Sequence, residues 1–109
     1  MLEEVWQLLD RSLKINPRHS ATLVEMGRLC DIRRDEASAE GYYERAIDAD
    51  QNNFRAYYRL ARLLNKADSF QEALEMIRAS VTTNPRDPQA RELLAELQKK
   101  LEKGKEDMD

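Results

Sequence analysis

Several residue types that define other classes of protein are scarce in this chain of 109 residues. A single cysteine excludes an internal disulfide, and three glycines and three prolines leave few positions for tight turns, which favours helix. No run approaches the roughly 18 apolar residues of a membrane span. Glu3 and Glu4 stand where a signal peptide carries positive charge, which predicts a cytoplasmic protein. If the sequence is a fragment of an exported protein, a periplasmic or other location is expected instead.

Charged residues are abundant, but their signs nearly cancel. They make up 36% of the chain, while the net charge is only −3. Such a balance creates no overall field that would select nucleic acid or an anionic membrane. We therefore expect no nucleic-acid partner and no membrane span, and we expect another protein or a peptide as partner.

The residue types that carry catalysis are isolated from one another. The only histidine, His19, follows the turn at Pro17 and has no second His or Cys at ligand spacing, so no metal site is predicted. Cys30 falls in an apolar stripe with no base nearby in sequence, which predicts a buried, inert thiol. The chain also has no glycine-rich phosphate loop. These observations predict a protein that is not an enzyme and that binds no cofactor.

The chain matches itself without a gap when residues 20–53 are laid on residues 54–87 and the same shift is continued to both ends. Positions that are large in one copy stay large in the others, and small positions stay small. The matched positions include Leu9, Tyr43 and Ile77; Val5, Ala39 and Ala73; Met26, Leu60 and Leu94; and Gly27, Ala61 and Ala95.

Each period contains two amphipathic helices. Residues 20–32, "SATLVEMGRLCDI", and residues 35–50, "DEASAEGYYERAIDAD", both place apolar side chains at helical spacing. A polar turn at residues 33–35 separates the two helices, and a loop at residues 50–53 follows them. The apolar stripes are Leu23, Met26, Gly27 and Cys30 in the first helix, and Ala39, Tyr43, Ala46 and Ile47 in the second.

This helix–turn–helix period, with the pattern W-x2-L-G-x2-Y, then A-x3-F, then P, resembles the tetratricopeptide repeat (TPR). The departures are the missing Trp, Glu36 where an aromatic residue is usual, and Gln51 in place of the proline. The slots hold Leu23, Met26, Gly27, Cys30, Ala39, Tyr43 and Gln51 in residues 20–53, and Tyr57, Leu60, Ala61, Leu64, Ala73, Ile77 and Pro85 in residues 54–87.

The resemblance implies an all-α fold, a right-handed α-solenoid of antiparallel helix pairs. It divides a single domain, residues 1–109, into a half repeat at 3–19, full repeats at 20–53 and 54–87, a capping helix at 88–103 and a frayed tail at 104–109. Gly27, Ala61 and Ala95 are expected to be small because two helices cross there, with Ala39 and Ala73 as the partners on the second helix.

A stripe of cations runs along residues 54–66, the first helix of the second full repeat. Arg55, Arg59 and Arg62 recur at i, i+4 and i+7, followed by Lys66, and so they share one face of the helix. In the family that the chain resembles, the first helix of each pair lines a concave groove. The residues predicted to face this groove or its edge are Val24, Arg28, Asp31, Arg55, Tyr58, Arg59, Arg62 and Asn65.

Two interpretations of the cation stripe remain open. In one, Arg59 and Arg62 pair with Glu92 and Glu96 on the neighbouring helix, while Arg28 pairs within its own helix; exposed pairs of this kind carry no function. In the other, the arginines hold an acidic segment or a C-terminal carboxylate of a peptide.

The second interpretation has partial support from the resemblance. Arg55 and Arg59 match, in type and spacing, the basic pair with which some TPR domains grip the C-terminal Asp of chaperone tails. Glu25, however, stands where those domains carry an Asn. The sequence predicts a peptide-binding interaction module or scaffold.

The N-terminal half repeat suggests a different function. The helix at residues 3–15 has no preceding helix to cover its outer side, so Trp6 and Leu2 are expected to be exposed. Either the chain is cut from a longer array, or two copies meet through Trp6 and Leu9. The alternative function is therefore a structural module that forms a homodimer.

Overall fold

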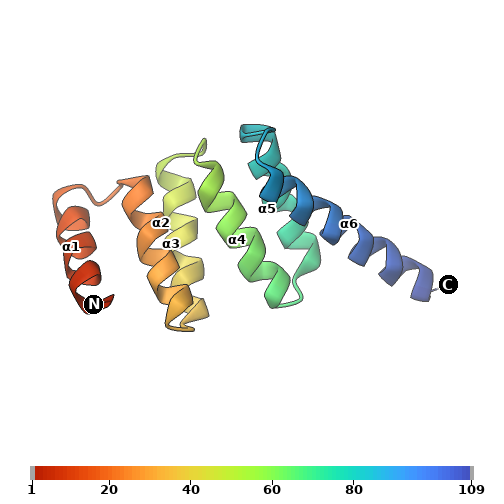
Figure 1. Cartoon of the computed structure of the whole chain (residues 1–109), viewed down its shortest axis with the longest axis horizontal. Helices are drawn as coiled ribbons and strands as arrows, with labels where there is room; N and C mark the ends of the chain where they lie inside the picture. Colours follow the sequence, from red (N-terminus) through yellow and green to blue (C-terminus); the bar gives the residue numbers. More distant parts are fainter. Residues whose placement is uncertain (1, 109) are drawn as a thin grey trace.

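The computed structural model describes residues 2–108, and it describes side chains for residues 2–104. Within this range the chain forms six helices and no strand, which confirms the all-α prediction. The molecule is elongated, with extents of 53 × 27 × 21 Å, and the helices follow one another along its long axis (Figure 1). The helices are α1 (Leu2–Ile15), α2 (Ser20–Ile32), α3 (Glu36–Ala49), α4 (Phe54–Lys66), α5 (Phe70–Thr83) and α6 (Pro88–Met108).

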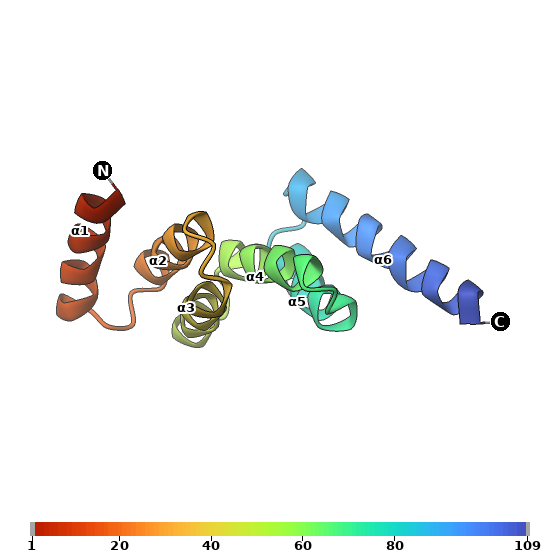
Figure 2. The ribbon, with the colours of Figure 1, turned by 90° about the horizontal axis from the view of Figure 1, so that it is seen from below.

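The helices form a layered array. The pairs α2–α3 and α4–α5 are helical hairpins, and α1 and α6 lie at the two ends of the array (Figure 1). In the second view, α3 and α5 lie along one side, whereas α2, α4 and the start of α6 lie along the other (Figure 2). Side chains of α2, α4 and α6 therefore share one surface of the molecule.

The turn inside each hairpin has the same geometry. Arg34 and Asp68, which occupy the same position in consecutive repeats, both adopt positive φ angles, 63° and 60°. In the first turn the backbone N–H of Asp35 donates to the carbonyl of Cys30 (2.9 Å), and the N–H of Arg34 donates to that of Asp31 (3.0 Å). This is the hydrogen-bond pattern of a Schellman motif, and the α4–α5 turn repeats it. Both turns thus end the first helix in the same way without a glycine.

Helix starts are capped by side chains in the first hairpin. The backbone N–H of Thr22 donates to His19 Nδ1 (3.2 Å), and the N–H of Ser38 donates to Asp35 Oδ1 (3.2 Å). Each bond satisfies an N–H group that has no partner inside its helix. His19, which follows the turn at Pro17 and is exposed, is therefore the N-cap of α2.

The crossing of α2 and α3 depends on Gly27. A Cβ atom at this position would lie 2.5 Å from Cε1 of Tyr43, whose side chain is completely buried. In the next hairpin, Ala61 and Ile77 occupy the corresponding positions and are also completely buried. The expected partner of Gly27 was Ala39, but the atoms nearest to this position belong to Tyr43, so the small residue of α2 lies against a large one of α3.

The third small position behaves differently, and the prediction for it was wrong. Ala95 is exposed rather than buried at a crossing. The residues of α6 that are buried are Ala90 and Leu97, and α6 packs on α5 and α4. Within residues 2–108 no second helix follows α6 to cross it, which leaves Ala95 uncovered.

The two ends of the array also differ from expectation. Helix α6 continues to Met108, through most of the segment for which a frayed tail was predicted, and Asp109 lies outside the described residues. At the other end, Trp6 is half-buried rather than exposed: its ring contacts Tyr42 edge-on at 6.0 Å, and the Arg33 guanidinium lies 5.2 Å from the centre of the ring. Leu2 is exposed, as expected.

Candidate functional site

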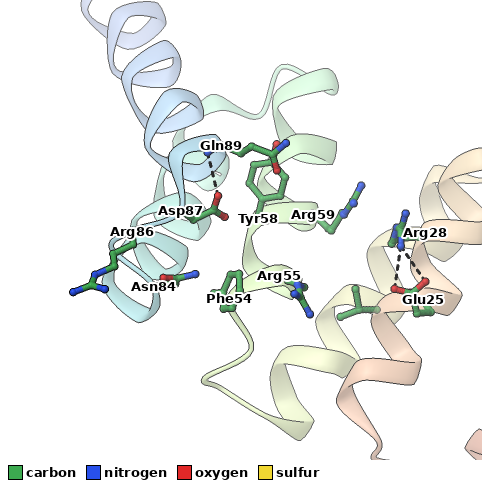
Figure 3. A pocket seen from close by; sticks show the side chains of 11 residues that line it. Glu25, Arg28, Phe54, Arg55, Tyr58, Arg59, Asn84, Arg86, Asp87 and Gln89 are labelled. Atoms are coloured by element: carbon green, nitrogen blue, oxygen red, sulfur yellow. Dashed lines mark hydrogen bonds and ion pairs between the residues drawn. The ribbon is translucent and has the colours of Figure 1, made fainter.

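Three adjoining hollows lie along the surface that α2, α4 and α6 share. The largest encloses about 570 Å³ between α2, α4 and the α5–α6 loop (Figure 3). A second, of about 480 Å³, lies between α4 and α6, and a third, of about 230 Å³, lies between α2 and α4. The predicted groove residues all line these hollows: Val24, Arg28, Arg55, Tyr58 and Arg59 in the first; Tyr58, Arg62 and Asn65 in the second; and Arg28, Asp31, Arg59 and Arg62 in the third.

Helix α4 supplies the centre of this surface. One face of α4 is buried through Leu60, Ala61 and Leu64, and the opposite face, with Arg55, Arg59 and Arg62, points outward. Figure 3 shows Tyr58 and Arg59 side by side between α2 and the start of α6. The repeat pattern thus fixes which side of α4 is available to a ligand.

The ion pairs predicted for α4 are not formed in the described part of the chain. Glu96 accepts a hydrogen bond from Asn65 Nδ2 (2.8 Å) and pairs with Lys100 Nζ at 3.6 Å, and Lys100 also donates to Asn65 Oδ1 (2.9 Å). Glu96 is thereby held away from the arginines. Among the described residues, neither Arg59 nor Arg62 pairs with a carboxylate, which corrects the interpretation that Glu92 and Glu96 neutralise them.

The pair predicted within α2 does form. Arg28 Nη1 lies 3.1 Å from both carboxylate oxygens of Glu25 (Figure 3). Both side chains are partly exposed, so the pair contributes little to stability. Its effect is on charge, because it neutralises the α2 side of the groove.

Aromatic rings support two of the arginines on α4. The Arg62 guanidinium lies 5.8 Å from the centre of the Tyr58 ring, and that of Arg55 lies 5.4 Å from the Phe54 ring. A cation over a ring face is attracted by the ring quadrupole without losing its charge. These contacts restrain the two side chains while leaving their N–H groups available.

Asp31 lines the third hollow and is held in place by a buried residue of α3. Its Oδ2 accepts a hydrogen bond from the hydroxyl of Tyr43 (3.3 Å). Burial is the main cause that raises the pKa of Tyr43, and the Asp31 charge raises it further. Tyr43 is therefore a protonated donor at neutral pH, so it connects the packed core to the groove.

Six residues that line the largest hollow were not among the predicted groove residues: Glu25, Phe54, Asn84, Arg86, Asp87 and Gln89. Arg86 and Asp87 come from the α5–α6 loop with Asn84, and Phe54 begins α4. Asp87 Oδ1 accepts the backbone N–H of Gln89 (3.1 Å), so it caps α6 rather than facing a ligand. The loop position was missed because the repeat register aligns helices and carries no information on how a loop folds back.

No other chemical site was found within the described residues. They contain no group of three or more His, Cys, Asp or Glu side chains that could hold a metal ion. Cys30 is buried, as expected, and burial is the main cause that raises the pKa of its thiol. None of the helices that the structure describes is long and apolar enough to cross a membrane.

Comparisons with known proteins agree on the fold. Residues 33–97 match a sequence model of the family described as "Tetratricopeptide repeat". The first TPR of Spaghetti (RPAP3), solved bound to the HSP90 peptide SRMEEVD, superposes with a TM-score of 0.84 at 15% identity, covering 92% of this chain and 79% of that one. The Arabidopsis OM64 TPR domain gives 0.81 at 17% identity, covering 90% and 81%. No sequence among the curated proteins matches the chain.

Proposed function

Because the chain belongs to the tetratricopeptide repeat family, we propose that it is a non-enzymatic protein–protein interaction module whose groove binds an acidic peptide segment. The observation that carries the proposal is the charge of α4. Arg59 and Arg62 line adjoining hollows, and in the described part of the chain neither is neutralised by a carboxylate. Guanidinium groups bind carboxylates through two parallel hydrogen bonds, which suits them to acidic side chains and to a chain terminus.

Two further features support this proposal. Tyr58 adds apolar surface beside the arginines, so a peptide can gain both charge pairing and apolar burial, whereas Val24 also lines the hollow but is only 4% exposed. The similar RPAP3 domain was solved with a peptide, SRMEEVD, that carries two glutamates and a C-terminal aspartate. Arg55 and Arg59, spaced by four, are the pair expected to hold a terminal carboxylate.

A binding assay with matched peptides tests this function. We would titrate fluorescent SRMEEVD, the same peptide with an amidated C-terminus, and SRMQQVN into the protein and into Arg59→Glu and Arg62→Glu. Each substitution is expected to weaken SRMEEVD binding by about tenfold or more, because a charge-assisted contact is replaced by a repulsion.

The control is Arg78→Glu, which makes the same charge change on the exposed side of α5, away from the three hollows. It should bind as the unchanged protein does, and helicity and melting should stay nearly unchanged in all variants. Equal binding of SRMEEVD and SRMQQVN would contradict the proposal. A matching loss of stability in the Arg variants would point to a structural role for the arginines instead.

A second candidate function is self-association through α1. The observation that favours it is the exposure of Leu2, Val5 and Leu8 on this helix. Trp6 and Leu9, the residues first expected to carry such a contact, pack against the core of the same chain instead. Light scattering at increasing protein concentration tests this candidate, and a constant monomer mass would rule it out.

A further inference from the structure

Helix α1 carries two apolar faces, and only one of them is used inside the chain. Trp6, Leu9 and Leu13 pack against the core. Val5 and Leu8 lie beside this face: at 100° per residue Leu8 is about a quarter turn from Leu9 and Val5 less than half of that, and they are 65% and 44% exposed. The second face is therefore an apolar surface of a well-formed helix that nothing covers within the described residues.

The spacing of this second face is that of a helix–helix seam. Val5, Leu8 and Ile15 follow the spacing of a coiled coil, while the fourth position of this line, Ser12, is turned toward α2, where its hydroxyl lies 3.2 Å from Thr22 Oγ1. Helix α1 has 14 residues, which is long enough for two heptads. A partner helix packing along this line would cover Val5 and Leu8 together.

The charged residues beside the seam of one copy can pair with those of a second copy. Glu4 and Arg11 are seven residues apart and flank the seam on the same side. Among the described residues neither is in an ion pair, whereas Glu3 pairs with Arg33 and Lys14 with Asp10. In an antiparallel pair of α1 helices, flanking positions on the same side face one another, so Glu4 of each copy meets Arg11 of the other.

We infer that two copies of the chain associate through antiparallel α1 helices, with Val5 of each packed on Leu8 of the other and Glu4 opposite Arg11 of the second copy. A two-fold arrangement uses one self-complementary surface twice, as closed dimers do. In a parallel pair, flanking positions on opposite sides of the seam face one another, so Glu4 and Arg11 would not meet. The inference rests on the self-association candidate and is independent of peptide binding in the groove.

A head-to-tail contact between α6 of one copy and α1 of the next fits less well. By the repeat register, the side of α6 that would meet α1 carries Arg91, Leu94, Ala95 and Gln98. Arg91 and Gln98 are polar and exposed where the corresponding residues of α2 and α4 are apolar. Packing Val5 and Leu8 against that face would bury polar groups without partners.

The antiparallel register makes a specific prediction about Ile15. At 87%, Ile15 is more exposed than Leu8, so a non-specific hydrophobic contact would depend on it most. When Glu4 lies opposite Arg11, however, Ile15 falls beyond the end of the partner helix. Leu8→Glu should therefore dissociate the dimer, and Ile15→Glu should not.

The test is the mass of the full chain by analytical ultracentrifugation over about 10 μM to 1 mM, since an interface of two turns is short and its dimer is expected to be weak. Glu4→Arg and Arg11→Glu should each weaken dimerisation by about fivefold or more, because each sets like charges opposite one another. The double variant Glu4→Arg/Arg11→Glu restores the pairing with the signs exchanged and should recover most of the association. Circular dichroism of each variant checks that α1 remains folded.

The possible outcomes separate the hypotheses. A dimer that the double variant restores, and that Ile15→Glu leaves intact, supports the inference. A dimer that is insensitive to the charge changes, or more sensitive to Ile15→Glu than to Leu8→Glu, overturns this arrangement but leaves self-association standing. A monomer at every concentration overturns both, while binding of SRMEEVD, measured separately with Leu8→Glu, reports on the groove alone.

Discussion

The helix pairs α2–α3 and α4–α5 share one register, yet their groove sides carry different charge. When the two repeats are aligned, Glu25 corresponds to Arg59 and Arg28 corresponds to Arg62. Helix α2 therefore carries an acid and a base that neutralise each other at 3.1 Å, whereas α4 carries two bases at the same positions. This difference in charge lies on the surface, because most buried positions of α2, such as Met26 and Cys30, correspond to buried positions of α4.

This comparison separates what the fold requires from what it leaves free. Packing of the hairpin constrains the buried positions of α2 and α4, such as Met26 and Leu60, which are both nearly inaccessible to solvent. The outward positions contribute little to stability, so their charges can vary without loss of the fold. Packing therefore does not require the concentration of positive charge on α4, which leaves these positions free for the proposed peptide contact.

The largest expected effect comes from a substitution at a buried position of the first hairpin. Gly27→Ala adds a Cβ atom 2.5 Å from the Tyr43 ring, which is enclosed and has no free space to move into. We expect a loss of about 1–2 kcal/mol in the free energy of unfolding, after allowing for the better helix propensity of alanine. Urea unfolding followed by circular dichroism measures it.

The control for this prediction imitates the second hairpin. Ala61 and Ile77 occupy the places of Gly27 and Tyr43, so Tyr43→Ile should make room for an alanine at position 27. In a double-mutant cycle, Gly27→Ala should cost less in the Tyr43→Ile background than in the unchanged protein. The same cost in both backgrounds would show that the Gly27–Tyr43 contact is not the cause.

The buried positions were the part of this molecule most accessible from sequence. Gly27 was predicted correctly because a crossing of two helices constrains the size of one residue, and a repeat shows that constraint more than once. The same argument gave a wrong prediction for Ala95, because a small residue is buried only where a second helix crosses it. Trp6 was misplaced for a related reason: the exposure of a terminal helix depends on its rotation, which the period does not determine.

The groove was predicted less completely, and the reason is physical. Helical spacing correctly placed the arginines of α4 on one face with Tyr58. It did not reveal that Glu96 is held by Asn65 and Lys100, because several long side chains compete for each carboxylate at nearly equal energy. Such competition is decided by rotamers and helix separation, which a sequence pattern does not encode.

A smaller effect is expected when the groove side of α2 is given the same charge as that of α4. Glu25→Arg converts the α2 position to that of α4, and it frees Arg28 from its carboxylate. The affinity for SRMEEVD should rise by about fivefold, equivalent to roughly 1 kcal/mol from one more charge-assisted contact. Glu102→Arg makes the same change of charge on α6, outside the hollows, and should give a clearly smaller gain. Equal gains would mean that only net charge matters.

The smallest effect concerns the second helices, where the repeat register places Glu44 of α3 on Arg78 of α5. Desolvation by burial raises the pKa of Glu44, and the nearby charges of Glu40, Asp48 and Glu72 raise it further. A carboxyl whose pKa is higher in the folded chain binds its proton more tightly there than in the unfolded chain. Stability from this group therefore falls as the pH rises from the unfolded pKa, about 4.3, through the raised folded value.

Replacing this carboxyl with an amide, in Glu44→Gln, tests that pH dependence. Glu44 is mostly exposed, so the substitution should increase stability at pH 7 by no more than about 0.5 kcal/mol. That gain should disappear below about pH 4, where the carboxyl is protonated in both states. Arg78→Gln, at the corresponding position of α5, leaves every carboxyl in place, so thermal unfolding at the two pH values should show no comparable pH-dependent gain for it. A gain for Glu44→Gln that is the same at both pH values would contradict this explanation, because the desolvation of the carboxylate and its repulsion by neighbouring carboxylates both depend on ionisation.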